Sequence, residues 1–260
     1  MRTLVVTAVA AERDAVCAAA GGHTARPLPG GYTLPGGYAL HRAPDGSPAP
    51  DVLAAGVGPA AAAAGTATAL TAADLTGAPY DLVVSAGIGG GFSPSAPLGS
   101  VVVADAIVAA DLGAETPDGF VPVTELGFGT TAHLPDPALV AALVRATGGA
   151  AGPVVTVSTV TGSAARAAEL ARRHPGVLAE AMEGFGVAEA AAAHRLPVLE
   201  IRTISNAVGP RDRAAWRIGP ALAALTDAFR MFPGALADLP VATTLPGAPT
   251  TPPDIPRRTP

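Results

Sequence analysis

The feature that most constrains the fold is a regular alternation of short apolar runs with longer alanine-rich segments. The apolar runs are TLVVTAV from Thr3, DVLAAGV from Asp51, DLVVSAGI from Asp81, SVVVADAIVA from Ser100, PVVTVSTV from Pro153 and PVLEIRTIS from Pro197. Runs this rich in β-branched residues are typical of strands covered on both faces. The segments between them have helical composition: AERDAVCAAA, PAAAAAGTATALTAADL, DPALVAALVRAT, SAARAAELARRH, GFGVAEAAAAHR and RAAWRIGPALAALTDAFRMF. This alternation predicts a three-layer α/β domain in which helices flank a mixed, mostly parallel central sheet.

Three stretches depart from the simple alternation. Residues 21–49 are rich in Gly, Pro and Tyr, which predicts a hairpin-like insertion or a loop. The run SVVVADAIVAAD is long enough to bend and to join two segments of the sheet. From Val241 the chain is rich in Pro and Thr, with too little apolar surface to offset the entropy of ordering it. We therefore expect one domain over residues 1–235 and a disordered tail over 241–260.

Composition excludes several classes of function. Hydrophobic residues make up 49% of the 260, enough for a sizeable core. A net charge of −5 with scattered basic residues leaves no footprint for nucleic acid. The single cysteine cannot form an internal disulfide, and the five histidines lack ligand spacing, so we predict no metal and no cofactor. Without a signal peptide pattern or a spanning apolar run, we expect a cytoplasmic protein with no membrane partner.

Carboxylates, an amide and glycines follow the predicted strands. Ligands of open α/β sheets bind beyond the carboxyl ends of the strands, so these residues are candidates for a site. They are Ala11-Glu12-Arg13, Gly56-Val57-Gly58-Pro59, the glycines of the GIGGG turn, Thr161-Gly162-Ser163, Met182-Glu183 and Ser205-Asn206. Together they predict one sheet edge that carries two carboxylates, one amide and several free backbone amides.

Each of these candidates also has a structural explanation. GIGGG lacks the G-x-G-x-x-G spacing and no helix follows it, so a tight turn is as compatible as a ligand site. Glu12 suits the first turn of a helix, and Ser205-Asn206 suits a helix N-cap. Glu183 lies in an apolar setting, where an unpaired carboxylate is costly, but a structural ion pair would satisfy it equally well. No serine lies in a G-x-S-x-G elbow, so a serine triad has no support.

In their order and spacing, these motifs resemble the purine nucleoside phosphorylase and nucleosidase superfamily from Thr3 to Phe232. The resemblance rests on AVAAERD, GVGPAAAA, SAGIGGGF, STVTGSAAR, EAMEGFG and RTISNAVG. The chain is most similar to the branch that contains methylthioadenosine/adenosylhomocysteine nucleosidase. Within that branch it is most similar to members that hydrolyse futalosine, a hypoxanthine nucleoside of menaquinone biosynthesis, partly through AADLGAETPDGF and ELGFGT. The resemblance implies a nucleoside phosphorylase-like fold, a small-molecule nucleoside substrate and a homo-oligomer.

The resemblance also implies roles for individual residues. Glu12 faces the attacking water, Met182 packs under the sugar, and Glu183 accepts hydrogen bonds from the ribose hydroxyls. Further residues are implied to line the substrate: Gly89 and Gly90 beside the ribose and water, Ala165 and Arg166 along the purine, Ser205 next to Asn206, and Trp216 near the 5′ substituent.

Asn206 departs from the pattern of the adenine-specific members, which have an Asp there that protonates the purine at N7. An Asn carries both a donor and an acceptor. Its NH2 group can donate to O6 of a 6-oxopurine while its carbonyl accepts a proton held at N7. The amide therefore predicts hypoxanthine or guanine as the leaving base. Because an amide is no general acid, the N7 proton has to come from solvent or a neighbour, with Asp212 a distant candidate.

Hydrolysis is favoured over phosphorolysis, because Glu12 would repel phosphate and the SAGIGGGF turn holds no Arg. Three alternatives stay open: a phosphorolytic 6-oxopurine nucleoside phosphorylase, a methylthioadenosine or aminofutalosine nucleosidase, and an inactive nucleoside-binding protein. The residues do not identify the 5′ substituent, and we expect Trp216 and residues 21–49 to select it.

Overall fold

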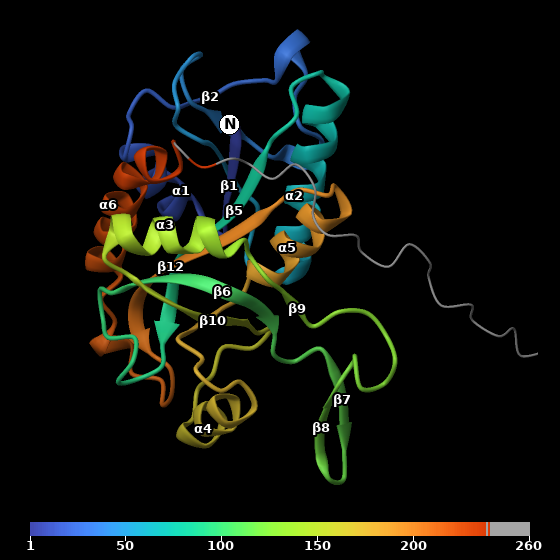
Figure 1. Cartoon of the computed structure of the whole chain (residues 1–260), viewed down its shortest axis with the longest axis vertical. Coiled ribbons are helices and arrows are strands. Elements are labelled where there is room, and N and C mark those ends of the chain that lie inside the picture. The colour runs from blue at the N-terminus through green and yellow to red at the C-terminus, as the bar shows by residue number, and fades with distance from the viewer. Residues whose placement is uncertain (238, 240–260) are drawn as a thin grey trace, which may run out of the picture.

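A mixed sheet runs through the middle of the molecule (Figure 1). The computed structural model describes residues 1–237 and 239, so the tail expected at 241–260 lies outside the described residues. The sheet has the order β11-β10-β6-β12-β5-β1-β4-β3-β2, and β9 pairs with β6. Its strands are β1 (Thr3–Thr7), β2 (Thr24–Ala25), β3 (Leu40–Arg42), β4 (Asp51–Ala54), β5 (Leu82–Gly91), β6 (Val101–Ala109), β9 (Ala132–His133), β10 (Ala150–Thr156), β11 (Ala179–Ala181) and β12 (Val198–Ala207).

The central strands of this sheet are parallel. β12 pairs with β5, β5 with β1, and β1 with β4, all in the same direction, whereas β6 runs antiparallel to β12. All five residues of β1 are buried, as are nearly all of β5 and β12. The predicted mixed, mostly parallel sheet is confirmed, and so is the predicted burial of its central strands on both faces.

Part of the sheet closes into a ring. β11 pairs in parallel with β10 and also antiparallel with β5, so β5, β12, β6, β10 and β11 form a closed circuit. β6 makes this possible because its first residues pair with β12 and its last residues with β9, while β10 follows it along most of its length. The long strand expected to join two segments of the sheet does so.

Helices cover both faces of the sheet. They are α1 (Ala10–Ala18), α2 (Pro59–Leu75), α3 (Pro137–Thr147), α4 (Ala164–Arg173), α5 (Gly184–Ala193) and α6 (Ile218–Leu236). Figure 1 shows α1, α3 and α6 gathered on one side and α2 with α5 on the other, and contacts within each group agree with that view. Each group closes its own apolar core against one face of the sheet. No helix among residues 1–237 has both the length and the apolar character that crossing a bilayer requires.

The structure corrects three expectations about where elements end. The predicted GIGGG turn is the last part of β5, and Ser205-Asn206 lies inside β12 rather than in a turn or an N-cap. The reason is that β5 and β12 pair from Val83 and Val198 to their ends, and this ladder outweighs the turn tendency of glycine and asparagine. The last helix was expected from Arg213 but begins at Ile218, after a separate 3-10 turn that the Asp212 carboxylate caps.

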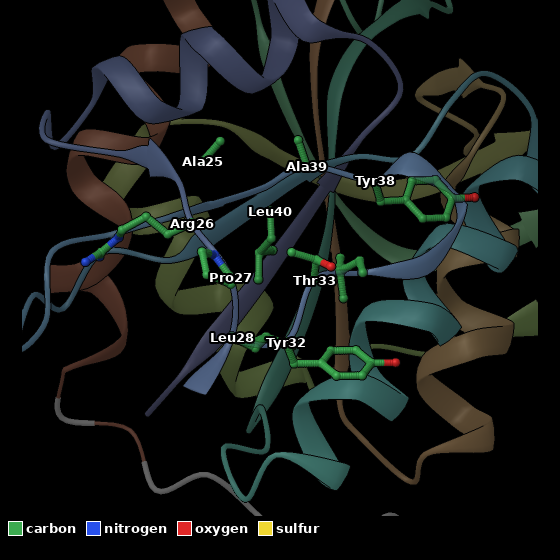
Figure 2. A pocket seen from close by; sticks show the side chains of 10 residues that line it. Ala25, Arg26, Pro27, Leu28, Tyr32, Thr33, Tyr38, Ala39 and Leu40 are labelled. Carbon is green, nitrogen blue, oxygen red and sulfur yellow. The ribbon is translucent and has the colours of Figure 1, made fainter. Parts of the chain in front are cut away.

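The region 21–49 is the expected hairpin-like insertion, since β2 and β3 pair antiparallel at the edge of the sheet. A cavity of about 190 Å³ lies within it, and Figure 2 shows its lining. The rings of Tyr32 and Tyr38 extend to one side of the segment, and Arg26 points the other way (Figure 2). A short hairpin that the sequence did not predict, β7 (Gly113–Thr116) with β8 (Gly119–Pro122), projects from the body near α4 (Figure 1).

Candidate active site

Four charged side chains gather inside the molecule where β5 and β12 run side by side. They are Glu12 (4% exposed), Glu183 (5%), Glu200 (0%) and Arg202 (1%), and we call them the carboxylate cluster. Buried charges persist only when they are paired and hydrogen-bonded. Three buried acids around one buried arginine are therefore stable only if their charged groups have hydrogen-bond or ion-pair partners.

Arg202 is the centre of this cluster. Its Nε donates to Oε1 of Glu200 at 2.8 Å, and its Nη2 donates to Oγ of Ser85 at 2.9 Å. Its Nη1 lies 3.3 Å from Oε2 of Glu183. Glu200 and Arg202 share one face of β12 because side chains alternate along a strand, and Ser85 lies directly beside Glu200 on β5. Each nitrogen of the guanidinium thus has a partner. Burial acts to lower the pKa of Arg202, but the surrounding carboxylates raise it above its ordinary value.

Glu12 reaches the cluster from the first turn of α1. Its Oε2 accepts hydrogen bonds from the amides of Ala8 (3.0 Å) and Val9 (3.3 Å), which closes the turn between β1 and α1. Its Oε1 accepts from the amide of Ile88 on β5 at 2.9 Å. A first-turn location was the structural explanation for this residue, but a side chain that served only its helix would not bridge to another strand. Burial raises the pKa of Glu12, and Arg202 offsets part of that effect.

Glu183 lies between β11 and α5 and connects two further elements to the cluster. Its Oε1 accepts from the amide of Gly58, which precedes α2, at 3.2 Å, and its Oε2 accepts from the amide of Met182 at 3.3 Å. Met182 is half-buried. Both predicted carboxylates therefore approach the same guanidinium, and the predicted convergence of Glu12 and Glu183 agrees with this geometry.

Two glycines leave the space that the cluster occupies. A Cβ atom on Gly87 would lie 2.5 Å from Oε1 of Glu12 and 2.8 Å from Nη1 of Arg202, so both groups face the same small space over β5. A Cβ atom on Gly184 would overlap the carboxylate of Glu200. Any side chain at either position would displace a charged group.

Asn206 lies further along the same pair of strands. It pairs with Gly90, three residues beyond Gly87, which corresponds to about 10 Å at the rise of a strand. Its Oδ1 accepts from the hydroxyl of Ser205 at 2.9 Å, and its Nδ2 donates to the carbonyl of Ala207 at 3.1 Å. Asn206 is half-buried, so its amide is both oriented and within reach of a ligand.

The start of α4 is tied to this end of β5 through β11. Glu180 pairs with Gly90 across the β11–β5 ladder, and its buried carboxylate accepts from the amide of Thr161 (2.9 Å) and from the Thr161 hydroxyl. Burial raises the pKa of Glu180, and the hydrogen bonds of Thr161 oppose that. Thr161 leads into α4, where Ala165 is exposed and the amide of Arg166 donates to the capping hydroxyl of Ser163 at 3.2 Å. The main chain of Arg166 thus already has an intramolecular partner.

Trp216 lies in the segment that folds back onto the end of β12. The amide of the next residue, Arg217, donates to the carbonyl of Ser205 at 2.7 Å. The guanidinium groups of Arg211 and Arg213 lie 5.8 and 5.9 Å from the Trp216 ring. Asp212 is exposed and its carboxylate accepts from the amide of Ala214, so it stabilises a turn.

Glu200, Arg202 and Glu180 were not predicted from the sequence, whereas Thr161 was among the residues expected after the strands. A signal for the first pair was present, because two opposite charges two residues apart in an apolar strand must share one buried face. The cavity of Figure 2 is lined by residues of the insertion. A second one of about 350 Å³ is lined by residues of the insertion and the N-terminus and by Asp51 and Asp81. No predicted site residue lines either cavity.

The geometry supports a definite kind of chemistry. A carboxylate held by three backbone amides, beside a second carboxylate and a shared cation, can accept hydrogen bonds from hydroxyl groups and can orient water. An oriented amide about 10 Å further along can both donate to and accept from a flat polar ring.

Comparison with known proteins gives a consistent result. Residues 35–229 match the model of the phosphorylase superfamily. A futalosine hydrolase of Streptomyces coelicolor is 69% identical over 228 residues, which cover 88% of this chain and 93% of that protein. A futalosine hydrolase of Acidothermus cellulolyticus is 47% identical over 234 residues, which cover 88% of this chain and 89% of that protein.

Solved structures agree at the level of the fold. A 5′-methylthioadenosine/S-adenosylhomocysteine nucleosidase from Colwellia psychrerythraea, in complex with adenine, superposes with a TM-score of 0.74 at 23% identity. It covers 91% of this chain and 96% of its own length. The corresponding nucleosidase from Neisseria meningitidis, in complex with methylthio-immucillin-A, gives a TM-score of 0.73 at 20% identity, over 92% of this chain and 99% of its own.

Proposed function

The chain belongs to the futalosine hydrolases of the phosphorylase superfamily, and from this premise we propose how its residues hydrolyse the N-glycosidic bond of futalosine. The reaction releases hypoxanthine and dehypoxanthinyl futalosine, a step of menaquinone biosynthesis. It requires a group that holds the ribose, a group that directs water to C1′, and a group that stabilises the departing base. The observation that supports the assignment most directly is that the buried carboxylates of Glu12 and Glu183 lie near the same buried guanidinium, that of Arg202.

Glu183 holds the sugar in this mechanism. Its two oxygens are fixed by the amides of Gly58 and Met182 and by Arg202, so the carboxylate cannot turn away. Its free lone pairs accept from the ribose 2′ and 3′ hydroxyls, and Met182 packs under the ring. As the C1′–N9 bond lengthens, the sugar gains oxocarbenium character, as in other glycoside cleavage. The negative charge beneath it stabilises that state.

Glu12 directs the water. Backbone amides hold both of its oxygens, which fixes the direction of the remaining lone pairs. A raised pKa makes the ionised form a stronger base, suited to taking a proton from water as it attacks C1′. The backbone of Gly89 lines the same stretch of β5.

Asn206 stabilises the departing base. Its NH2 group donates to O6 of hypoxanthine, and its carbonyl, already oriented by Ser205, accepts a hydrogen bond from N7–H once N7 has taken a proton from solvent. Preorganised donors of this kind act on charge that develops in the transition state. Gly90, which pairs with Asn206, has no side chain, so the base can lie close to the backbone there. In this proposal Ala165 and Arg166 border the purine, and Trp216 borders the 5′ substituent.

Phosphorolysis is the competing reaction on this fold, and the charge distribution disfavours it. The buried cation of the site, Arg202, already contacts Glu183, Glu200 and Ser85. A phosphate beside Glu12 and Glu183 would meet two negative charges without an unengaged guanidinium.

The test offers futalosine, aminofutalosine, inosine and methylthioadenosine to the purified protein, with and without phosphate. Released bases and sugars are identified by liquid chromatography with mass detection. We expect hypoxanthine from futalosine at a rate that phosphate does not change. Formation of a sugar 1-phosphate, or preferential release of adenine, would refute the assignment.

The working form of the enzyme is proposed to be a cytoplasmic homo-oligomer. Support comes from exposed apolar side chains next to the β7–β8 hairpin, those of Leu112, Leu126 and Phe128. Such side chains suit burial against a second copy. Light scattering coupled to size-exclusion chromatography should give a multiple of the mass of one chain, and a monomer would contradict the proposal.

A further inference from the structure

Glu200 is the one member of the carboxylate cluster to which the proposed mechanism gives no role. It is fully buried, and one of its oxygens accepts from Nε of Arg202 at 2.8 Å. Its other oxygen, Oε2, has no hydrogen-bond partner among the described residues. An unpaired buried carboxylate oxygen costs stability, and apolar residues often replace such ion pairs without loss. Its presence in the middle of an apolar strand therefore calls for a functional reason.

The geometry of Arg202 supplies that reason. A guanidinium is planar, so two fixed contacts determine where its third nitrogen points. Glu200 holds Nε, and Ser85 holds Nη2. The remaining Nη1 then lies 3.3 Å from Oε2 of Glu183 and faces the same space over Gly87 as the carboxylate of Glu12.

We propose that Glu200 is a positioning residue of the hydrolytic site: by holding Nε of Arg202, it aims Nη1 between Glu12 and Glu183. This inference rests on the proposed function of those two acids. Glu200 itself touches neither water nor sugar. Its effect passes entirely through the guanidinium, whose position decides how the positive charge lies relative to the two carboxylates.

The charged groups that face Glu200 are Arg202, in direct contact, and Glu183 beyond it. The backbone of Gly184 packs against its carboxylate from α5. Because the proposal concerns the acceptor oxygen, a neutral amide that keeps this oxygen should keep the function.

The decisive comparison is between Glu200→Gln and Glu200→Val. Both remove the charge, but only Gln retains an acceptor for Nε of Arg202. A matched control is Asp51→Asn, which alters another buried acid paired with an arginine, Arg2, at 2.8 Å on β4. Hypoxanthine release from futalosine gives kcat and KM, and circular dichroism gives Tm and the folded fraction.

We expect Glu200→Gln to stay within about three-fold of the wild-type kcat/KM. Glu200→Val should lose at least about ten-fold per folded molecule relative to wild type, which corresponds to ~1.4 kcal/mol. Asp51→Asn should lower Tm and leave kcat unchanged. A wild-type kcat/KM for Glu200→Val would overturn the inference, and so would an equal loss in both Glu200 variants. If the wild-type protein released no hypoxanthine, the proposed function would fail instead, which separates the two outcomes.

A second measurement applies if Glu200→Val does not fold. Ser85→Ala removes the other contact that fixes the plane of the guanidinium, so Arg202 then keeps only its contacts with Glu200 and Glu183. Groups that act through a shared partner are not additive. Glu200→Gln should therefore cost more kcat/KM in the Ser85→Ala background than in the wild type, and equal costs would refute positioning.

Discussion

Replacing Glu12 by Gln tests the central chemical claim, because it keeps the shape of the side chain and removes the base. In the wild-type protein three backbone amides donate to the carboxylate, at 2.9, 3.0 and 3.3 Å. A Gln offers one acceptor oxygen, so its NH2 group must face at least one of these N–H donors. One buried donor left without an acceptor costs about 1–3 kcal/mol, and we expect a loss of stability of that size.

The effect on catalysis should be larger than the effect on stability. General bases contribute about 10²–10⁴-fold to a rate, or ~3–5 kcal/mol of the activation barrier. We therefore expect kcat to fall by at least about 100-fold. Glu12 faces the water rather than the ribose hydroxyls in the proposed mechanism, so KM should change by less than about three-fold.

The assay measures hypoxanthine release from futalosine over a range of pH. Burial raises the pKa of Glu12 above its ordinary value of 4.5. A base has to be ionised, so wild-type activity should fall as pH decreases through this raised pKa, and the acid limb due to Glu12 should be absent from Glu12→Gln. The same shift affects stability in the opposite sense: the folded state holds this proton more tightly, so the contribution to stability is lost as pH rises through the raised pKa.

Asp14→Asn is the matched control, since it changes an exposed carboxylate of the same helix and should leave kcat unchanged. A Glu12→Gln variant that kept more than a tenth of the wild-type kcat would refute the role of Glu12 as base. So would a variant that lost activity but kept the wild-type acid limb.

Three further predictions follow from the same geometry. Asn206→Asp should shift the ratio of the kcat/KM values for futalosine and aminofutalosine by about ten-fold or more in favour of aminofutalosine, because a carboxyl group suits a 6-aminopurine. If competition assays gave an unchanged ratio, the matching of the amide to a 6-oxopurine would be refuted. Gly184→Ala should lower the free energy of unfolding in urea by about 1–3 kcal/mol, because its Cβ atom overlaps the Glu200 carboxylate. Gly219→Ala is the control, since its Cβ atom meets open space and should not destabilise the protein, and equal effects of the two variants would contradict the packing. Burial raises the pKa of the Cys17 thiol to about 11, so at pH 8 this thiol should react with iodoacetamide at least about ten-fold more slowly in the folded protein than in urea. Equal reaction rates, measured by mass spectrometry, would show that the thiol is accessible and ionised in the folded protein.

Much of the fold was predictable because its signals are local. The central strands β1, β4, β5, β6, β10 and β12 follow the β-branched runs, and the helices follow the alanine-rich segments between them. The shorter elements were missed for a physical reason. β11 has three residues, too few to show a period of two, and it forms because β10 and β5 lie on either side of it. The β7–β8 hairpin, by contrast, is local: the turn Pro117-Asp118 before Gly119 joins its strands, and this turn signal was not used in the prediction.

The candidate site was predictable in part. Glu12, Glu183 and Asn206 were identified by motif, and the structure brings the first two to Arg202. The glycines were assigned to a turn because GIGGG has the local signature of one, and only the ladder to β12 reveals a strand. Arg202 and Glu200 were not predicted as site residues, because the run VLEIRTIS was interpreted from its apolar residues alone. The alternation of side chains along the strand, which places both charges on one face, was not used. Whether these residues act on substrate as proposed stays a prediction.

The closed circuit of β5, β12, β6, β10 and β11 has a mechanical consequence. A strand at the free edge of a sheet can separate from its single neighbour, but a strand within a closed ring is hydrogen-bonded on both sides. Gly90 is held by Asn206 on one side and by Glu180 on the other. The strands that carry the site are therefore restrained on both sides, and we expect access to it to depend on the segments beside them that carry Thr161 and Trp216.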